Sequence, residues 1–449
     1  MNHLLRELLP TLDVEEAYAE RVLDLGAGAA LPSALPVNTL ACGSVAAAGL
    51  AGAALWGGRR VRVDPRQVAV SFRNDQVQTV DGAQVPGFAP LSGFFEAADG
   101  WVRTHANYPH HHVRLLRALG LREGATRDDA AAAVRQRSAQ ELEDVVTADH
   151  GIAVRVRDHS EWMASEQAAA VRQHPLLAVA RVGDEADPVR PAVPGRPKVL
   201  DLTRVLAGPV ATRTLALLGC DVLRVDSPHL PELDAIHLDT DSGKRSTLVD
   251  LQDEHARTRL HQLLDHADVL VTGYRPGALA AYHLDAESVA AQHPHVIHAS
   301  LSAWTPSGPW GGRRGFDSIV QAATGIALLE SRDGTVPGAL PAQALDHATG
   351  YLLAAGVLTA LRRRSQEGGT WRVEAHLART AHWLLQTDAL DGPVDAVDDV
   401  APWTVGGDTA YGHVVQARPA LTLDDSPREF AWVGRRHGAD EPTWDNQPT

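Results

Sequence analysis

The sequence predicts an α/β protein, with a Rossmann-like parallel sheet in a large domain and a smaller α+β domain beside it. The first observation is the continuous apolar run Lys198–Leu202, which is typical of a strand buried on both faces of a parallel sheet. The second is the alternation of such runs with helical stretches, which indicates βαβ units. The third is a segment rich in proline and charge, residues 184–197, which we interpret as a linker.

The large domain can be followed element by element after this linker. The first strand leads through a turn, with Gly208 and Pro209, into a helix predicted over residues 210–218, because proline is tolerated where a helix begins. A second, strongly apolar helix is predicted to follow Asp346. The other predicted strands cover residues 221–226, 269–272, 296–300 and 370–375.

Before the linker the pattern of elements is mixed. Residues 101–121 predict a strand followed by a helix, residues 127–149 are helical in composition, and residues 151–156 predict another strand. We therefore divide the chain into three parts. These are a small-domain-like region (1–190), a Rossmann-like catalytic domain (191–395), and a C-terminal tail that packs on the large domain (396–449).

Two segments share a helix–strand pattern. Residues 40–72 and the residues from 345 onward both show a small-residue loop, an apolar helix, a basic turn with glycine and a short strand. In our alignment Ala41 stands where Asp346 stands in the second copy. The alternative is that any two alanine-rich helix–strand units look alike. If the repeat is real, we expect one copy to be catalytic and the other to be a scaffold.

Composition sets limits on the function. The chain has 449 residues, a net charge of −15 and 44% hydrophobic residues. This acidic balance argues against nucleic acid and anionic membrane surfaces as partners, because both require a basic face. No secretion signal is recognisable, and the longest apolar run, residues 45–56, is too short to span a bilayer. We therefore expect a cytoplasmic protein.

Cysteine and histidine indicate no metal or redox chemistry. Cys220 lies between a helix and a strand and is expected to be a buried small hydrophobic residue, and no disulfide framework or zinc site is predicted. The consecutive residues 110–112 are all histidine and cannot all face one ion, so we interpret them as a solvated loop or helix start. The turn 203–209 lacks the G-x-G-x-x-G pattern, so NAD is not expected.

Six segments of the second half carry a family resemblance. In order they are VLDLTRVLAGPVATRTLALLGCDVLRVD (199–226), SGKRSTLVDL (242–251), ADVLVTGYRPGAL (267–279), HVIHASLSAWTPSGPW (295–310), RGFDSIVQAATG (314–325) and ALDHATG (344–350). Together they resemble the class III CoA-transferases, which include formyl-CoA and carnitine CoA-transferases and the related α-methylacyl-CoA racemases. Residues 91–111 and 149–177 resemble the small-domain part that comes later in such chains, so the order of the parts is altered. The tail resembles a shortened form of the family's closing segment.

The resemblance implies that Asp346 is the catalytic nucleophile. A carboxylate can attack the carbonyl of an acyl-CoA thioester, which gives a mixed anhydride and CoA thiolate. The thiolate then forms an aspartyl-CoA thioester, and an incoming carboxylic acid repeats the steps in reverse. The small residues Ala348 and Gly350 are expected to let backbone N–H groups approach the oxyanion. Without the resemblance, the N-cap of a helix is the favoured interpretation of Asp346.

The resemblance also implies a CoA site at the carboxyl end of the sheet, where open α/β folds bind ligands. Arg204 is expected to meet a phosphate, and Tyr274 offers a face on which a base can stack. Lys244 and Arg245 either join this site or form a solvated basic turn. The residues expected to contact CoA are Arg204, Val205, Leu206, Ala207, Val249, Gly273, Tyr274 and Arg275.

The predicted function is transfer of CoA between an acyl-CoA and a carboxylic acid, with CoA thioesters as substrates and no tightly bound cofactor. Phe316 stands where the related racemases carry a histidine, and racemisation needs a base on each face of the α-carbon, so transfer is favoured. The alternatives are an acyl-CoA racemase or epimerase and a non-catalytic CoA-binding partner subunit. Because family members form dimers, we expect a homodimer. The alternative is a monomer whose first half fills the partner's place.

Overall fold

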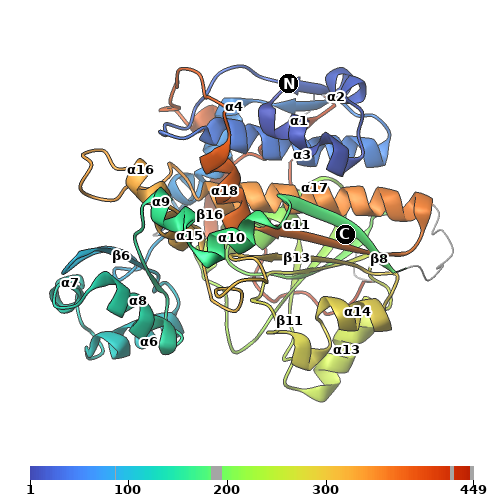
Figure 1. Ribbon diagram of the computed structural model, residues 1–449. Helices are drawn as coiled ribbons and strands as arrows, with labels where there is room; N and C mark the ends of the chain where they lie inside the picture. The colour runs from blue at the N-terminus through green and yellow to red at the C-terminus, as the bar shows by residue number, and fades with distance from the viewer. Residues whose placement is uncertain (86, 184–194, 425–428, 445–449) are drawn as a thin grey trace.

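A seven-stranded sheet lies at the centre of the computed structural model, which describes residues 1–85, 87–183, 195–424 and 429–444 (Figure 1). All neighbouring strands of this sheet run parallel except the last pair, in which β8 is antiparallel to β14. The predicted α/β class is confirmed. In spatial order the strands are β11 (Arg245–Leu248), β10 (Asp221–Asp226), β9 (Lys198–Leu202), β12 (Val269–Thr272), β13 (Ile297–Ser302), β14 (Thr370–His376) and β8 (Leu177–Gly183).

Helices cover both faces of this sheet (Figure 1). On one face lie α11 (Ala207–Leu217) and the long α17 (Ala344–Glu367), and on the other lie α13 (Glu254–Leu264) and α14 (Ala286–Gln292). The predicted strands are confirmed within two residues, and the helix predicted from residue 210 begins at Ala207. The remaining helices of the large domain are α12 (Asp234–Thr240), α15 (Asp317–Thr324), α16 (Ile326–Leu329), α18 (Leu377–Gln386) and the 3-10 turn η1 (Ala280–Tyr282).

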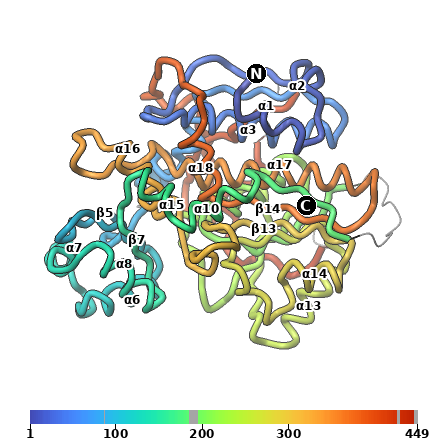
Figure 2. Tube along the Cα trace, viewed as in Figure 1, coloured from blue at the N-terminus to red at the C-terminus, as the bar shows by residue number. Residues whose placement is uncertain are grey.

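A small α+β part projects to one side of the molecule (Figure 2). Its strands β5 (Gly93–Ala97), β6 (Gly100–Thr104) and β7 (Ala153–Arg155) form an antiparallel sheet. This part has an apolar core of its own, in which Val102, Leu115 and Leu142 are buried. The predicted strand–helix succession is present, with the helical stretch 127–149 divided in two. The helices are α6 (Pro109–Leu119), α7 (Arg127–Val134) and α8 (Ala139–Ala148), and α9 (His159–Met163) and α10 (Glu166–Arg172) lead back to the large sheet.

The N-terminal segment forms a third layer that packs on α17 (Figure 1). The described residues of the expected region 1–190 therefore do not form one unit: they lie in this layer, in the small α+β part, in strand β8 of the large sheet and in two short strands that pair with the tail. The layer contains α1 (His3–Leu12), α2 (Glu16–Val22), α3 (Val37–Trp56), α4 (Pro65–Phe72), α5 (Asn74–Val77), β1 (Leu23–Leu25) and β2 (Val61–Val63).

The tail connects this layer with the large domain. Its strand β17 (Thr422–Leu423) pairs with β2, and Trp444 donates a hydrogen bond from its indole nitrogen to the Leu263 carbonyl, 3.0 Å away. The other tail elements are η2 (Ala401–Trp403), β15 (Thr404–Thr409) and β16 (Gly412–Ala417), which join β3 (Thr79–Val80) and β4 (Ala83–Gln84) in a four-stranded sheet.

Helices α3 and α17 pack against each other and have matching surroundings. A Cβ at Gly49 of α3 would meet Val61 of the strand that follows, at 2.5 Å, and one at Gly356 of α17 would meet Val373 of the strand that follows, at 2.6 Å. The repeat is therefore seen in the structure. This register pairs Thr39, not Ala41, with Asp346, so our sequence alignment was displaced by two residues.

By length and composition alone, α3 and α17 could cross a membrane. The apolar window of α17 is 100% buried in the molecule and that of α3 is 78% buried. Their apolar character is accounted for by their contact with each other and with the sheet, because a helix that is hydrophobic on all sides is typical of a protein core as well as of a bilayer.

Candidate active site

A cavity of about 330 Å³ lies where α17, the loop after β9 and the small α+β part meet. Asp346 lines this cavity, together with all of the residues expected to contact CoA except Val249. The loops after β9, β12 and β13 contribute to it, at the carboxyl end of the sheet. The lining includes Tyr108, His110, His111, Arg204, Val205, Leu206, Ala207, Gly273, Tyr274, Arg275, Leu301, Arg313, Arg314, Phe316, Asp346 and Leu377.

Asp346 is the third residue of α17, and its side chain is only 4% exposed. The residue at the N-cap position is Gln343, so the alternative that Asp346 caps the helix is wrong. Within the described residues the Asp346 carboxylate has no salt bridge. Gly350, one turn further along, is required for packing: a Cβ there would lie 2.4 Å from the Ala207 carbonyl oxygen.

Asp317 supplies the cap that Asp346 does not. Its carboxylate accepts the backbone N–H groups of Leu345 and Asp346, at 2.9 and 3.0 Å, and the side-chain amide of Gln321. Burial raises the pKa of Asp317 to about 6. Burial, and then the negative charge of Asp317, raise the pKa of Asp346 well above its ordinary value. The two carboxyl groups therefore form a pair that resists full ionisation.

The loop between β9 and α11 is held in a strained conformation. Val205 has φ of 70°, a left-handed backbone conformation that is unfavourable for a β-branched residue. Its N–H group donates to a carboxylate oxygen of Glu232 at 3.0 Å. Glu232 also accepts the hydroxyl of Tyr108 from the small α+β part and pairs with the buried Arg224 at 3.2 Å. One buried carboxylate thus connects the strained loop, the small part and the core of the large domain.

Arg204 lines the cavity with its charge already balanced. Its guanidinium group lies 3.7 Å from Glu232 and 5.1 Å from the centre of the Tyr108 ring, and it donates to the Pro231 carbonyl. This arrangement fixes the side chain against the cavity wall.

Histidines of the small α+β part lie at the cavity, where His110 and His111 contribute to its lining. His105 stacks on Phe316 with ring centres 3.8 Å apart, and His111 meets the same ring edge-on at 5.9 Å. Burial lowers the pKa of His105 to about 3 and that of His111 to about 2, so both imidazoles are neutral near pH 7. His110 lines the cavity beside His111. The prediction of a helix start at 110–112 is confirmed, but the prediction that this segment is solvated is wrong for His111, which is buried.

Lys244 and Arg245 are not a solvated turn. Lys244 is buried and pairs with Asp201 at 3.1 Å, and Arg245 is buried and pairs with Asp221 at 3.0 Å. Asp241 lies 3.6 Å from Lys244 and also pairs with Arg224, so Lys244, Asp201, Asp241 and Arg224 form one buried network. Neither cation lines the cavity.

Other candidates lie away from the cavity. The Val249 side chain is buried in an apolar cluster, and its N–H group donates to the Asp226 carbonyl. His347 stacks on Phe72 of α4 at 4.7 Å. Cys220 is buried as predicted. In the parts of the chain that the structure describes, no three His, Cys, Asp or Glu side chains are grouped as metal ligands.

Known proteins were compared with the whole chain. The profile of CoA-transferase family III matches residues 52–189 and 197–410. An acetyl-coenzyme A transferase from Hypoxylon pulicicidum is 30% identical over 330 residues, which cover 67% of this chain and 55% of that protein. A probable fatty acyl-CoA transferase from Mycobacterium tuberculosis is 34% identical over 184 residues, which cover 38% of this chain and 47% of that protein.

A crystal structure of a hypothetical protein from Mycobacterium tuberculosis has 33% sequence identity and a TM-score of 0.39, over 43% of this chain and 56% of that one. This chain spans about half the length of the curated relatives it matches. The profile, in contrast, matches a segment in each half of the sequence; most of the linker predicted between them lies outside the described residues. The chain therefore belongs to CoA-transferase family III.

Proposed function

We propose that this protein is a CoA-transferase that moves CoA between an acyl-CoA and a carboxylic acid, with Asp346 as the nucleophile. The observation that carries this proposal is a buried carboxylate, without a cationic partner among the described residues, in the wall of a cavity at the carboxyl end of the sheet. A structural aspartate this deeply buried is normally paired or hydrogen-bonded. Relatives named as CoA-transferases support the reaction class.

The reaction begins when an Asp346 carboxylate oxygen attacks the thioester carbonyl carbon. The carbon–sulfur bond breaks, CoA leaves as its thiolate, and the acyl group remains on Asp346 as a mixed anhydride. The thiolate attacks the aspartyl carbonyl, which forms aspartyl-CoA thioester and releases the first carboxylic acid as its carboxylate. The incoming carboxylate then takes the place of the first, and the same steps in reverse give the new acyl-CoA and free Asp346.

The surroundings of Asp346 suit this chemistry. Burial and the charge of Asp317 raise the pKa of Asp346, and a more basic, less hydrated carboxylate is a stronger nucleophile. Asp317 holds the start of α17 through two backbone N–H groups, which positions Asp346 without neutralising it. Small side chains around the nucleophile, Ala207 and Ala303, leave room for the thioester.

A second candidate is an acyl-CoA racemase or epimerase. Position 316 carries phenylalanine where the related racemases carry histidine, but the small α+β part brings His110 and His111 into the same cavity as Asp346. A neutral imidazole and a carboxylate in one cavity could each serve one face of an α-carbon. Incubation of a 2-methylacyl-CoA in deuterated water separates the two candidates: exchange of the α-hydrogen without added acid supports racemisation, and absence of exchange with transfer to an added acid supports a transferase.

The direct test of the proposal is turnover of Asp346→Ala with acyl-CoA and a panel of acids. A transferase loses turnover but still binds CoA, whereas a non-catalytic CoA-binding subunit has no turnover to lose. The expected homodimer stays a prediction. Light scattering distinguishes a monomer of 48.0 kDa from a particle of twice that mass.

A further inference from the structure

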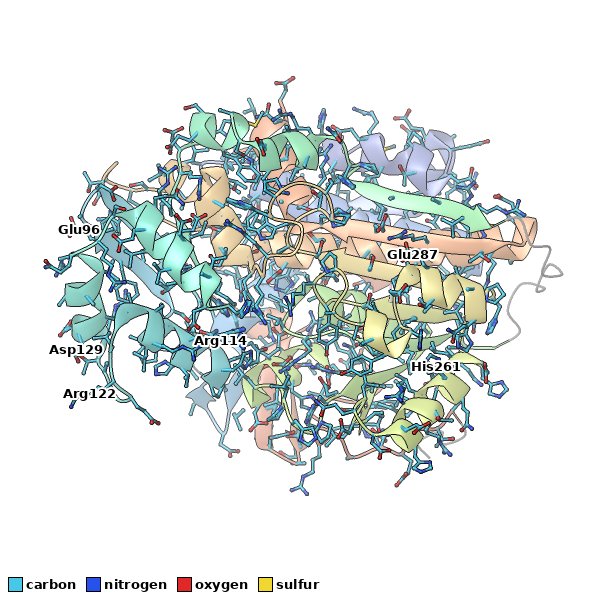
Figure 3. The ribbon with its side chains drawn as sticks, turned by 60° about the horizontal axis from the view of Figure 1, so that its bottom comes forward. Glu96, Arg114, Arg122, Asp129, His261 and Glu287 are labelled. Atoms are coloured by element: carbon cyan, nitrogen blue, oxygen red, sulfur yellow. The ribbon has the colours of Figure 1, made fainter. Side chains whose placement is uncertain are left out.

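A second cavity, of about 270 Å³, lies at the carboxyl ends of β12, β13 and β14. After β12 the chain crosses to α14 on one face of the sheet, and after β13 it reaches α17 on the other face (Figure 1). Loops that part in this way open a crevice at the strand ends, and such crevices are where open α/β sheets bind ligands. Glu287, which Figure 3 shows on α14, lines this cavity.

A row of polar side chains from two neighbouring strands lines the cavity. Every second residue of β13 and of β14 takes part, so these side chains share one face of the sheet. The paired residues are His298 with Arg372, Ser300 with Glu374, and Ser302 with His376. A sheet face that packs against a helix is normally apolar, so this row is better explained by contact with something polar.

The charged groups of this row are already engaged by the protein. Arg372 pairs with Glu374 at 2.9 Å and lies 3.5 Å from Glu287. The carboxylate of Asp285 accepts the backbone N–H group and the hydroxyl of Ser288, at 3.0 and 2.6 Å. The cavity therefore has little need of a charged ligand.

The groups that remain without partners are uncharged. The His298 side chain is only 6% exposed, and neither of its ring nitrogens makes a hydrogen bond of accepted geometry within the described residues. Burial, then the positive charge of Arg372, lowers the pKa of His298 to about 4, against weaker opposing effects of the Leu284 backbone and Asp285. The ring is therefore neutral near pH 7 and offers one donor and one acceptor.

An imidazole buried in this way is unfavourable unless a partner satisfies it. The hydroxyl groups of Thr272 and Ser300 line the same cavity and make no hydrogen bond to another described residue. Leu279 and Leu284 add apolar surface to the lining. A ligand that matches these groups carries several groups that both donate and accept, together with a C–H surface.

We propose that this cavity binds an uncharged polyhydroxy compound, a sugar or a cyclic polyol, through His298, Ser300 and Thr272. Each ligand hydroxyl accepts from one protein donor and donates to one protein acceptor, and the C–H surface of the ring packs on Leu279 and Leu284. The site is distinct from the one at Asp346, which does not line this cavity. Tyr274, Arg275, Leu301 and Ser302 line both cavities, so the two sites are neighbours.

The experiment is NMR titration of the full-length protein, labelled with ¹⁵N in its histidines, with glucose, ribose and myo-inositol. Glucuronate and glucosamine are titrated as charged counterparts. The His298 signals are assigned by their loss in His298→Leu. His261 of α13 (Figure 3) is the internal reference, because its ring nitrogens already face His293 at 3.2 Å and the Tyr282 carbonyl at 3.0 Å.

We expect a saturable shift of both His298 ring nitrogens with at least one uncharged compound and none at His261. His298→Leu should weaken binding of that compound about tenfold, measured by calorimetry, as for the loss of a buried hydrogen-bonding partner. His255→Leu, on the exposed side of α13, should leave it unchanged. Ser300→Ala, with a smaller loss expected, serves if His298→Leu does not fold.

Three results would overturn the proposal. The first is that no uncharged compound shifts the His298 nitrogens. The second is that glucuronate or glucosamine binds at least tenfold more tightly than glucose, which would assign the cavity to a charged ligand. The third is that both His298→Leu and Ser300→Ala bind as the wild type does. None of these results depends on whether Asp346 is acylated.

Discussion

Helices α3 and α17 each pack a glycine, Gly49 or Gly356, on a valine of the strand that follows, but their first turns are opposite in character. At the start of α3, the carboxylate of Asp391 accepts the backbone N–H groups of Asn38 and Thr39, at 2.8 and 2.9 Å, and the Thr39 hydroxyl at 2.8 Å. At the start of α17, Asp317 accepts the equivalent N–H groups, but a second carboxylate, Asp346, stands in the place of Thr39.

The comparison places the unfavourable buried group, the Asp346 carboxyl, in the first turn of α17. In α3 the N–H groups of Asn38 and Thr39 and the Thr39 hydroxyl all have a partner, as expected of a scaffold. In α17 the same position holds a buried acid whose ionisation is resisted by its surroundings. Local rules of stability are broken in one copy and obeyed in the other, which is the pattern expected of a functional site beside its scaffold.

The largest expected effect is on activity. Asp346→Asn keeps the shape of the side chain but removes the nucleophile, so we expect transfer to fall by about 10³-fold or more. Thr39→Val, at the matching position of α3, should leave the transfer rate unchanged. Both are measured as CoA transfer between an acyl-CoA and an acid. Comparable losses in the two variants would mean that the copies are not divided into a catalytic one and a scaffold.

The next prediction concerns the contact that α3 and α17 each make between a glycine and a valine of the following strand. Gly356→Ala and Gly49→Ala each push a methyl group into a valine of the following strand, and overpacking of this kind costs about 1–3 kcal/mol. We expect similar losses in the free energy of unfolding, measured by urea denaturation. A large loss at one glycine and none at the other would contradict the equivalence of the two helices.

The neighbours of the two helices also differ. Gly43 of α3 faces Asn2 and Leu4 of the N-terminus, whereas Gly350 of α17 faces Ala207, at the end of the strained loop held by Glu232.

Glu232→Gln removes the charge that holds Val205 and balances Arg204. We expect KM for the acyl-CoA to rise about tenfold with a smaller change in kcat, because the loop binds rather than reacts. A fall in kcat at constant KM would count against this role.

Replacement of Asp346 should lower activity but raise the stability of the fold. Because its pKa is raised in the folded protein, the unfolded chain releases this proton at a lower pH, so the group destabilises the fold above the ordinary aspartate pKa and not below it. Asp346→Asn should therefore raise the free energy of unfolding at pH 7 by about 1–2 kcal/mol. The gain should vanish near pH 3, and thermal unfolding at both pH values checks it. An Asp346→Asn protein less stable at pH 7 would contradict the destabilising pair.

The smallest expected effect is a displacement of the pH profile. In the proposed mechanism only ionised Asp346 attacks, so the rate of acylation in a single turnover should rise with pH and reach half its maximum above the ordinary aspartate range. Asp317→Asn removes the neighbouring charge and should move this midpoint to lower pH, although burial remains. Identical midpoints would show that Asp317 does not influence the nucleophile.

Sequence reasoning succeeded where one physical rule dominates. Buried parallel strands have to be apolar throughout, so residues 198–202 and 269–272 could be located from composition. It failed where partners come from distant parts of the chain. The place of Lys244 was left open between the CoA site and a solvated turn because Asp201 is remote in sequence, and His111 looked solvated because its contact with Phe316 exists only after folding.

In the candidate site, too, residues within recognisable segments were proposed and their distant partners were not. Asp346 and the loop 204–207 were proposed as site residues through a family resemblance, not through periodicity. The repeat was recognised, but its register was not, because the alignment followed Leu40 and Leu345 instead of the tightly packed glycines. Asp317 and Glu232 were missed, since nothing in their immediate sequence distinguishes a carboxylate that positions a nucleophile or a loop from one that is simply exposed.

The measurement that tests the central claim most directly is chemical trapping of the nucleophile. The full-length protein is incubated with a panel of acyl-CoAs, treated with hydroxylamine, and its peptides are mapped by mass spectrometry. The account predicts a hydroxamate on Asp346 with a productive donor and none on the same peptide of Asp346→Asn. CoA binding without a hydroxamate on Asp346 for any donor, or a hydroxamate on another carboxylate, would contradict it.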